Sequence, residues 1–150
     1  MKKSNTLESH IGYWLRFVSN HVSLSFTKRL GERGVGVGEW IVLNLLYEQK
    51  SLSPAEIAQV IGMTRGATSK LLDRLFSKQL ITREEPLKDR RYQNISISAE
   101  GKDLLPILIK EAEMNEKHFF GHLSHEQKNL LTNILKDIIS IKKWNKIPID

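Results

Sequence analysis

Apolar residues recur every three or four positions along much of the chain, and this spacing places them on one face of an α-helix. The first such helix is expected to begin at Ile11, with Asn5 and Glu8 resembling a capping box before it. Four glycines within 31–38 interrupt the pattern and predict a flexible connection. Residues 40–47 are apolar on nearly every side, which is typical of a buried helix.

Two helices separated by a tight turn are predicted next. Ser53, Pro54 and Glu56 combine a capping serine, a proline at the first helical position and a glutamate at the third, so three start signals agree. Gly62 is suited to end this helix, and Thr64 is suited to cap the following one. The pattern therefore predicts a helix, a turn and a second helix over 64–78.

The helix over 64–78 is expected to have one apolar face and one basic face. Asp73 is the only acidic residue in this stretch, so the basic face keeps most of its positive charge. The apolar face comprises Thr68, Leu72, Leu75 and Phe76. The basic face comprises Arg65, Gly66, Lys70 and Arg74.

Residues 80–84 and 93–98 both resemble short strands, the second with alternating apolar and polar residues, and together they predict a β-hairpin. A helix-turn-helix followed by a hairpin is a winged helix, in which the second helix enters the major groove of DNA and the hairpin tip reaches the backbone or minor groove. Cations at the tip would neutralise phosphates, and Asp89 would hold a neighbouring arginine by a charge-assisted pair. The turn carries Lys88, Asp89, Arg90 and Arg91.

The last third of the chain predicts two further helices. Ser98 is suited to cap the first, which contains Pro106 as a local kink, and Ser124 with Gln127 is suited to begin the second. The apolar stripe of the second helix is too wide for one small chain to cover, so we expect a homodimer built from the terminal helices. The stripe comprises Leu130, Leu131, Ile134, Leu135, Ile138 and Ile141.

Composition narrows the possible functions. The 150 residues carry a formal net charge of +6, which favours an anionic partner, and the absence of cysteine excludes disulfides and thiolate metal sites. The apolar runs are too short for a membrane span, so a cytoplasmic protein without membrane association is expected. No phosphate-binding glycine loop, nucleophile elbow or paired acid and base is recognisable, so neither an enzyme nor a cofactor is indicated.

Three stretches resemble the MarR family of bacterial transcription regulators, in the same order and across nearly the whole chain. They are S-x-x-E-hydrophobic-A over 53–58, L-x-R-L over 72–75, and D-x-R followed by an alternating strand and an [ST]-x-x-G helix start. The third stretch comprises Asp89, Arg91, Ile95, Ile97, Ser98 and Gly101, with serine where the family usually has threonine.

The resemblance implies a mainly α fold with a small β-hairpin, namely a winged helix-turn-helix flanked by N- and C-terminal dimerisation helices. It also implies a homodimer that binds palindromic double-stranded DNA and responds to a small-molecule effector, commonly an anionic aromatic compound. No motif identifies residues for that ligand. The expected division is a dimerisation helix and connection over 1–36, a DNA-binding domain over 37–98, and dimerisation helices with a tail over 99–150.

The expected function is therefore that of a dimeric, sequence-specific transcription regulator, a repressor released by a small ligand. Lys70 projects toward base edges by helical phase, whereas Thr64 and Ser69 suit phosphate contact and Arg91 leads the wing. The predicted DNA-binding residues are Ser53, Thr64, Arg65, Gly66, Ser69, Lys70, Arg74, Lys88, Asp89, Arg90 and Arg91.

Alternative interpretations stay open. A winged helix can bind an acidic protein in place of DNA. A metal-responsive regulator is possible because His118 and His122 have the i, i+4 spacing of a helix face, with His125 nearby, although histidines are also favourable near a helix C-terminus. Four aromatic residues either line an effector pocket or belong to the core: Trp14, Phe17, His21 and Trp40.

Overall fold

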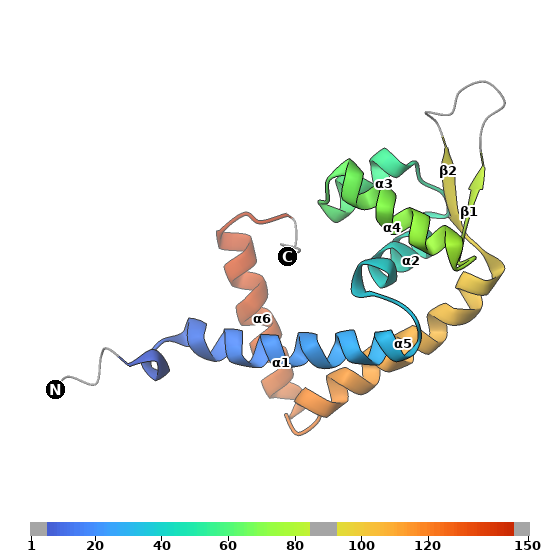
Figure 1. The fold of residues 1–150 in the computed structure, drawn as a ribbon. Coiled ribbons are helices and arrows are strands. Elements are labelled where there is room, and N and C mark those ends of the chain that lie inside the picture. Colours follow the sequence, from blue (N-terminus) through green and yellow to red (C-terminus); the bar gives the residue numbers. More distant parts are fainter. Residues whose placement is uncertain (1–5, 85–92, 146–150) are drawn as a thin grey trace.

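The computed structural model describes residues 6–84 and 93–145. These residues form six α-helices, a short 3-10 helix and one antiparallel pair of strands, which confirms the predicted mainly α fold (Figure 1). The elements are η2 (Leu7–Ser9), α1 (Ile11–Glu32), α2 (Val37–Gln49), α3 (Pro54–Ile61), α4 (Arg65–Ser77), β1 (Ile81–Glu84), β2 (Asn94–Ile97), α5 (Ala99–Phe120) and α6 (His125–Ile141).

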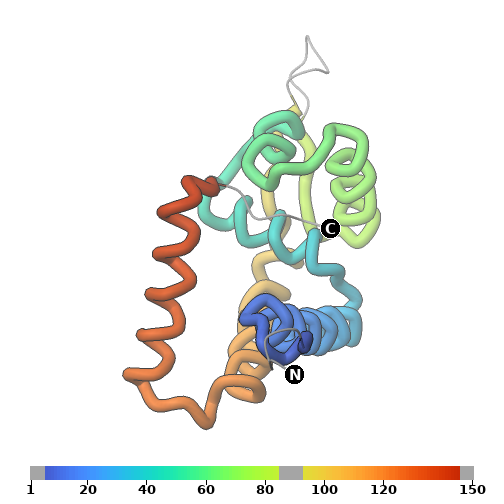
Figure 2. Tube along the Cα trace, turned by 90° about the vertical axis from the view of Figure 1, so that its left-hand side faces the viewer, coloured from blue at the N-terminus to red at the C-terminus, as the bar shows by residue number. Residues whose placement is uncertain are grey.

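Helices α2, α3 and α4 and the two strands form one compact unit, and the long helices α1 and α5 lie side by side next to it (Figures 1 and 2). Helix α6 turns back from the end of α5 and stands apart from the compact unit (Figure 2). None of the residues of α6 is buried. The fold of a single chain therefore leaves this last helix largely uncovered.

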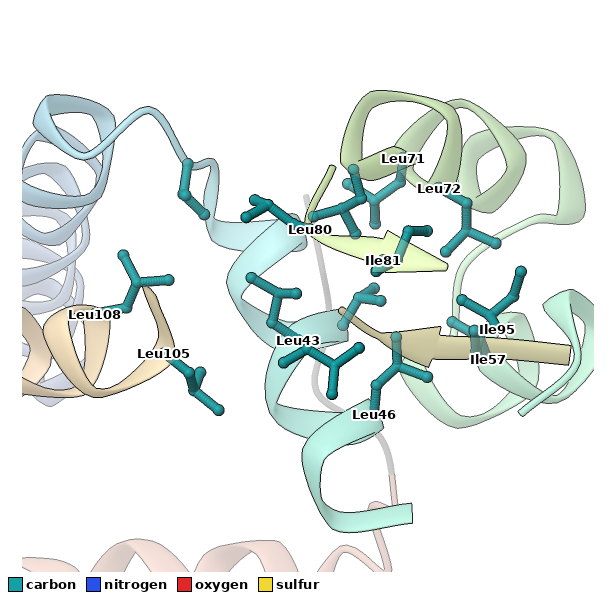
Figure 3. Close-up of a cluster of buried hydrophobic side chains, with 14 of the residues drawn as sticks. Leu43, Leu46, Ile57, Leu71, Leu72, Leu80, Ile81, Ile95, Leu105 and Leu108 are labelled. Atoms are coloured by element: carbon teal, nitrogen blue, oxygen red, sulfur yellow. The ribbon is translucent and has the colours of Figure 1, made fainter. Parts of the chain in front are cut away.

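The hydrophobic core is centred on α2, as expected for its nearly continuous apolar sequence (Figure 3). Val42, Leu43 and Leu46 are completely buried, and they meet side chains from α3, α4 and both strands. Leu105 and Leu108 extend the core into α5. This packing makes α2 the support on which the helix-turn-helix and the hairpin are both held.

The hairpin is joined to the helical unit at its base. Strands β1 and β2 pair antiparallel in a register that runs from Ile81 opposite Ile97 to Glu84 opposite Asn94. Leu52, just before α3, forms a reciprocal backbone bridge with Ile95, with N···O distances of 3.0 and 2.7 Å. The strand that leads from the wing is thereby tied to the start of the helix-turn-helix.

Ser98 and Gly101 connect the base of the wing to α5. The Ser98 hydroxyl donates to the Gln79 carbonyl oxygen at 2.6 Å and accepts from the Gly101 backbone N–H at 3.0 Å. A Cβ atom on Gly101 would overlap the Leu80 carbonyl oxygen and lie 2.7 Å from Cγ1 of Ile97. The serine-x-x-glycine motif is thus explained by capping and by the close approach of α5 to the strand ends.

Three expectations about the helices need correction. Helix α1 begins at Ile11 after His10, whereas Glu8 lies in the separate η2 turn and Asn5 lies outside the described residues, so the capping box does not begin this helix. The connection within 31–38 is shorter than expected, because α1 continues to Glu32 and α2 begins at Val37. Phe76 is half exposed, and Leu71 takes the buried position on α4.

Candidate nucleic-acid interface

Two local caps fix the turn between α3 and α4. The Ser53 hydroxyl accepts from the Glu56 N–H at 3.2 Å, and the Thr64 hydroxyl accepts from the Ala67 N–H at 3.2 Å. Gly62 has a φ of +72°, a left-handed conformation that glycine adopts without strain, and so ends α3 sharply. Each cap uses an acceptor lone pair, which leaves the O–H groups of Ser53 and Thr64 able to donate to a phosphate.

Apart from Phe76 and Leu71, helix α4 separates its buried and exposed residues as predicted. Thr68, Leu71, Leu72 and Leu75 are buried, and the Thr68 hydroxyl donates to the Thr64 carbonyl oxygen at 2.8 Å. The predicted DNA-binding residues of this helix are exposed on its other side, at spacings that bring them together on one surface: Arg65, Gly66, Ser69, Lys70 and Arg74. We call this surface the basic face.

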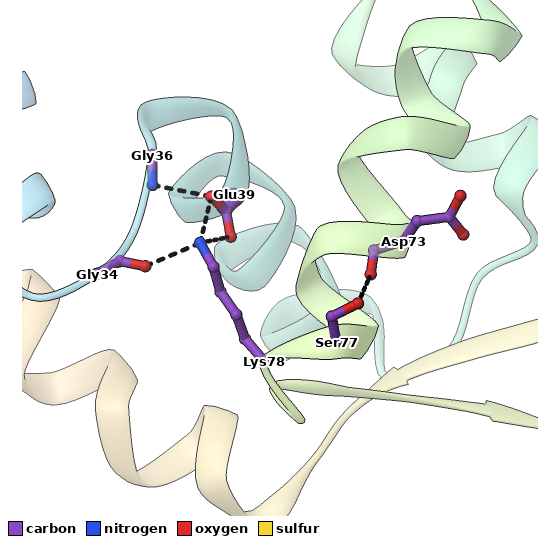
Figure 4. Close-up of polar contacts among 6 residues, drawn as sticks. All are labelled: Gly34, Gly36, Glu39, Asp73, Ser77 and Lys78. Atoms are coloured by element: carbon purple, nitrogen blue, oxygen red, sulfur yellow. Dashed lines mark hydrogen bonds and ion pairs between the residues drawn. The ribbon is translucent and has the colours of Figure 1, made fainter.

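The basic face is less offset by acid than the sequence indicates. Asp73 lies next to it, but its carboxylate binds the Arg83 guanidinium of β1 at 2.6 Å. Lys78, the fourth cation of this stretch, is turned toward Glu39 at 2.7 Å (Figure 4). Of the four cations in residues 64–78, Arg65, Lys70 and Arg74 therefore stay able to attract an anion from solution.

Arg83 also fastens the hairpin to α4. Its guanidinium carbon lies 4.8 Å from the centre of the Phe76 ring, which is a cation–π distance, in addition to the bond with Asp73. Arg83 was not among the residues predicted for the DNA interface. The signal was present, because the alternation of a strand places Arg83 on the same face as the buried Ile81, facing the helix.

The predicted wing-tip residues Lys88, Asp89, Arg90 and Arg91 lie outside the described residues. Their expected contacts with DNA stay predictions. Of the hairpin, the structure describes the two strands: β1 ends at Glu84 and β2 begins at Asn94. Both lie on the same side of the unit as α3 and α4 (Figure 1).

An open hollow of about 560 Å³ lies between α3 and the start of α4, with Gln59, Thr64 and Arg65 among its lining residues.

The histidine motif does not form a helical pair, and His118 lies near a helix C-terminus as the alternative interpretation has it. His118 lies in the last turn of α5, His122 follows the end of that helix, and His125 is the first residue of α6, so the three do not share a helix face. Across the residues that the structure describes, no group of three or more His, Cys, Asp or Glu side chains could hold a metal ion.

The four aromatic residues do not behave alike. Trp40 packs against the core and meets the Phe26 ring edge-on at 5.9 Å, which agrees with a core role. Trp14 and Phe17 are about half exposed on α1, so a core role is wrong for these two within a single chain. His21 lies beside Phe17, with ring centres 5.1 Å apart, and is also exposed.

Among the described helices, none is long and apolar enough to cross a membrane.

Comparison with known proteins identifies relatives by sequence. The profile of the MarR family matches residues 33–91. The transcriptional regulator PrsX of Escherichia coli is 30% identical over 113 residues, which cover 74% of this chain and 68% of PrsX. The transcriptional repressor MdtR of Bacillus subtilis is 31% identical over 101 residues, which cover 67% of this chain and 65% of MdtR.

Solved structures share the fold. BpsR of Bordetella bronchiseptica, whose DNA binding is regulated by 6-hydroxynicotinic acid, aligns with a TM-score of 0.75 at 17% identity over 89% of this chain and 96% of its own. A variant of MarR from E. coli complexed with operator DNA aligns with a TM-score of 0.73 at 18% identity, over 86% and 93% of the two chains. The sequence relatives, the matching profile and the winged helix-turn-helix agree, and the chain belongs to the MarR family of DNA-binding transcriptional regulators.

Proposed function

We propose that the protein is a cytoplasmic, homodimeric repressor that binds a palindromic operator in a sequence-specific way and is released by a small ligand. The observation that carries this proposal is the basic face of α4, which is exposed between a capped turn and a hairpin fastened to the same helix. In this arrangement α4 enters the major groove, and the hairpin reaches the neighbouring backbone or minor groove. Residues 37–98 act as the DNA-binding domain, and residues 1–36 and 99–150 contain the helices that form the dimer interface.

The side chains of the basic face have different tasks in this proposal. Lys70 lies in the middle of α4 and reads a base edge, where an ammonium group is suited to the acceptors of guanine. Arg65, Ser69 and Arg74 contact phosphates, together with the Ser53 and Thr64 hydroxyls. Phosphate contacts fix the register of the protein on the duplex, and Lys70 contributes the sequence preference.

Dimer formation is supported by the apolar residues that the single chain leaves exposed on α1 and α6. Ile11 is 79% exposed and Leu24 71% exposed on α1, and Leu130 is 63% exposed and Ile141 75% exposed on α6. Isolated exposed apolar residues are normal, but a stripe along the whole of a helix is typical of an interface. The two-fold axis of such a dimer imposes a half-site separation of about 10 to 10.5 base pairs, one helical turn of DNA.

Repression and release by a ligand are supported by what is known of related proteins. A dimer that occupies promoter DNA blocks its use, and the relative MdtR is named as a repressor. BpsR, which shares the fold, is regulated by a small aromatic acid. The same kind of control is therefore proposed for this protein, with the identity of the ligand left to a screen for release from DNA.

The decisive experiment measures binding of the purified protein to the duplex upstream of its own gene and to a scrambled duplex of equal length. Both are titrated at low and near-physiological salt. Binding that survives salt on the native sequence alone would support specific regulation, because general phosphate attraction weakens steeply as salt rises. Equal binding to both duplexes would contradict the proposal, and absence of binding would favour a protein-interaction module.

Two substitutions separate the roles of the recognition helix and the wing. Lys70→Ala should reduce discrimination between native and mutated operators by about 1–3 kcal/mol, because a base contact is lost. Arg91→Ala should weaken binding to all duplexes and lower the salt dependence by about one phosphate contact. Fluorescence anisotropy titrations measure both effects, and unchanged affinities in both variants would show that these residues are wrongly assigned.

A further inference from the structure

A polar cluster around the buried Glu39 carboxylate joins the end of the recognition helix to the connection between α1 and α2 (Figure 4). The Lys78 ammonium lies 2.7 and 2.9 Å from the two carboxylate oxygens of Glu39 and 2.9 Å from the Gly34 carbonyl oxygen. The same Glu39 carboxylate accepts the Gly36 backbone N–H at 3.1 Å. One lysine and one glutamate therefore hold three separate segments together.

Because Glu39 is buried, its carboxylate depends on the partners that surround it. Glu39 is only 4% exposed, and a carboxylate removed from water needs both a counter-charge and hydrogen-bond donors. Lys78 and Gly36 supply them. Close packing reinforces the contact, because a Cβ atom on Gly38 of α2 would lie 3.3 Å from a methyl carbon of Leu71 on α4.

The cluster continues into the α1 and α5 framework. The connection that carries Gly34 follows directly from α1, where Arg33 approaches the Glu111 carboxylate of α5 at 3.4 Å. Farther along α1, the Asn115 side-chain amide of α5 donates to the Val22 carbonyl oxygen at 3.2 Å. A continuous set of contacts thus leads from the recognition helix to the long helices.

Lys78 itself is not suited to bind phosphate. An ammonium group has three N–H donors, and the Glu39 oxygens and the Gly34 carbonyl oxygen provide three acceptors. Contact with DNA would require the lysine to leave a buried carboxylate without its counter-charge. Its position at the end of a basic helix would otherwise make it look like a fourth DNA contact.

We propose that Lys78 and Glu39 are positioning residues that fix the direction of the recognition helix relative to α1, and so determine which operator spacing the dimer accepts. The inference rests on the proposed function as a dimeric DNA-binding regulator. In a symmetric dimer, a change in this direction displaces both recognition helices at once. Lengthening the operator by one base pair moves the half-sites apart by about 3.4 Å, a step that a rigid dimer rejects and a loosened one tolerates.

The test compares operators with the natural half-site separation and with one base pair more or fewer. The unmodified chain, Lys78→Met and Glu39→Gln are titrated with each duplex and with a single half-site. Lys110→Met is the control, because it removes the same charge from an exposed residue without an ion pair among the described residues. The spacing preference is the ratio of the affinities for the natural and the altered operators, and it should fall at least about threefold in the two test variants. It should not change in the control, and neither the half-site affinity nor the salt dependence should change in any variant.

Each result decides the inference. An unchanged spacing preference in both test variants would overturn it, and so would a salt slope lowered by about 0.9 in Lys78→Met, since that would place Lys78 on a phosphate. If thermal melting shows that Lys78→Met does not fold, Glu39→Gln decides, because its amide oxygen still accepts from Gly36. A chain that binds scrambled DNA equally well overturns the proposed function and the inference with it, whereas specific binding with unaltered spacing preference overturns the inference alone.

Discussion

Gly101 lies in the first turn of α5, where its Cα faces the Leu80 carbonyl oxygen and the Ile97 side chain. Any larger residue must displace the backbone at the base of the wing. Around Gly66 and Gly31, in contrast, no atom outside their chain neighbours and their own helix backbone lies within 4 Å of the position that a Cβ would take. Close packing therefore requires glycine at position 101 but not at positions 66 and 31.

Gly101→Ala should lower the free energy of unfolding by about 1–3 kcal/mol or more, because the added methyl group overlaps backbone as well as side-chain atoms. Urea denaturation followed by circular dichroism measures the change. Gly31→Ala serves as the matched control and should keep or slightly raise stability, since alanine is the better helix former. Equal stability of the Gly101 variant and the unmodified chain would contradict the packing explanation.

Gly66→Ala should separate stability from DNA binding. The substitution is expected to stabilise α4 by up to about 1 kcal/mol, because it removes backbone freedom from the unfolded chain. It should nevertheless weaken binding to the operator if the absence of a side chain lets the DNA backbone approach the helix. Melting curves and anisotropy titrations on the same preparation test both expectations, and a stabilised variant with full affinity would remove Gly66 from the interface.

At the scale of elements, the hairpin and the recognition helix are held as one part by Arg83. Asp73 has a side-chain exposure of 64%, so its ion pair with Arg83 should contribute at most about 1 kcal/mol to stability. Its effect on binding should be larger, for two reasons. Without Arg83, a carboxylate next to the basic face would repel phosphates, and the wing would lose its contact with Phe76.

Arg83→Ala should therefore bind operator DNA more weakly while melting at nearly the same temperature as the unmodified chain. The double variant Asp73→Asn with Arg83→Ala should regain only part of the lost affinity, because it removes the repulsion without restoring the position of the wing. Anisotropy titrations of both single variants and the double variant form the required cycle. Complete recovery in the double variant would leave no role for the position of the wing.

The elements that sequence analysis predicted best are those fixed by contacts within four residues. Ser53, Gly62 and Thr64 act on their own helix ends, so the turn between α3 and α4 was predicted in full. Helix α1 begins at Ile11 as expected, but the capping box predicted before it was wrong although its signal looked similar. The Trp14 indole N–H donates to the Glu8 carbonyl oxygen at 2.9 Å, which belongs to a separate turn that the pattern did not indicate.

The candidate site was predicted only in its outward-facing part. The exposed residues of α4 follow from helical phase, but the partners of Asp73 and Lys78 do not, because Arg83 lies on a strand and Glu39 on another helix. Such pairs depend on how the elements pack together. Phe76 was assigned to the core because it continues an apolar stripe, and a cation from the hairpin covers it in place of apolar side chains.

For the whole molecule, the exposed stripe on α6 predicts the effect of one added charge. Ile134→Glu should prevent dimer formation and reduce operator affinity to that of a single half-site, because an unpaired carboxylate would be buried in the interface. Asn133→Glu adds the same charge to the neighbouring position of the same helix. Sedimentation velocity should find monomers for the first variant and dimers for the second, and a dimeric Ile134→Glu protein would place the interface elsewhere.

Stability should also depend on protein concentration. If the folded dimer unfolds directly to separate chains, each tenfold increase in concentration stabilises the folded state by about 1.4 kcal/mol of dimer. The thermal midpoint measured by calorimetry should rise accordingly. A midpoint that stays constant over two orders of magnitude of concentration would indicate that the exposed stripe is not part of a dimer that unfolds in this way.

The reciprocal bridge between Leu52 and Ile95 has a consequence for how the DNA-binding unit opens. These two amides protect each other although they lie far apart in the chain, so neither can exchange its proton with solvent until the start of α3 and the second wing strand separate. Helix-turn-helix and hairpin should accordingly open as one cooperative unit, with equal protection factors at both amides. Local unfolding would then abolish DNA contact by both elements together, and a half-competent state of the winged unit would not accumulate.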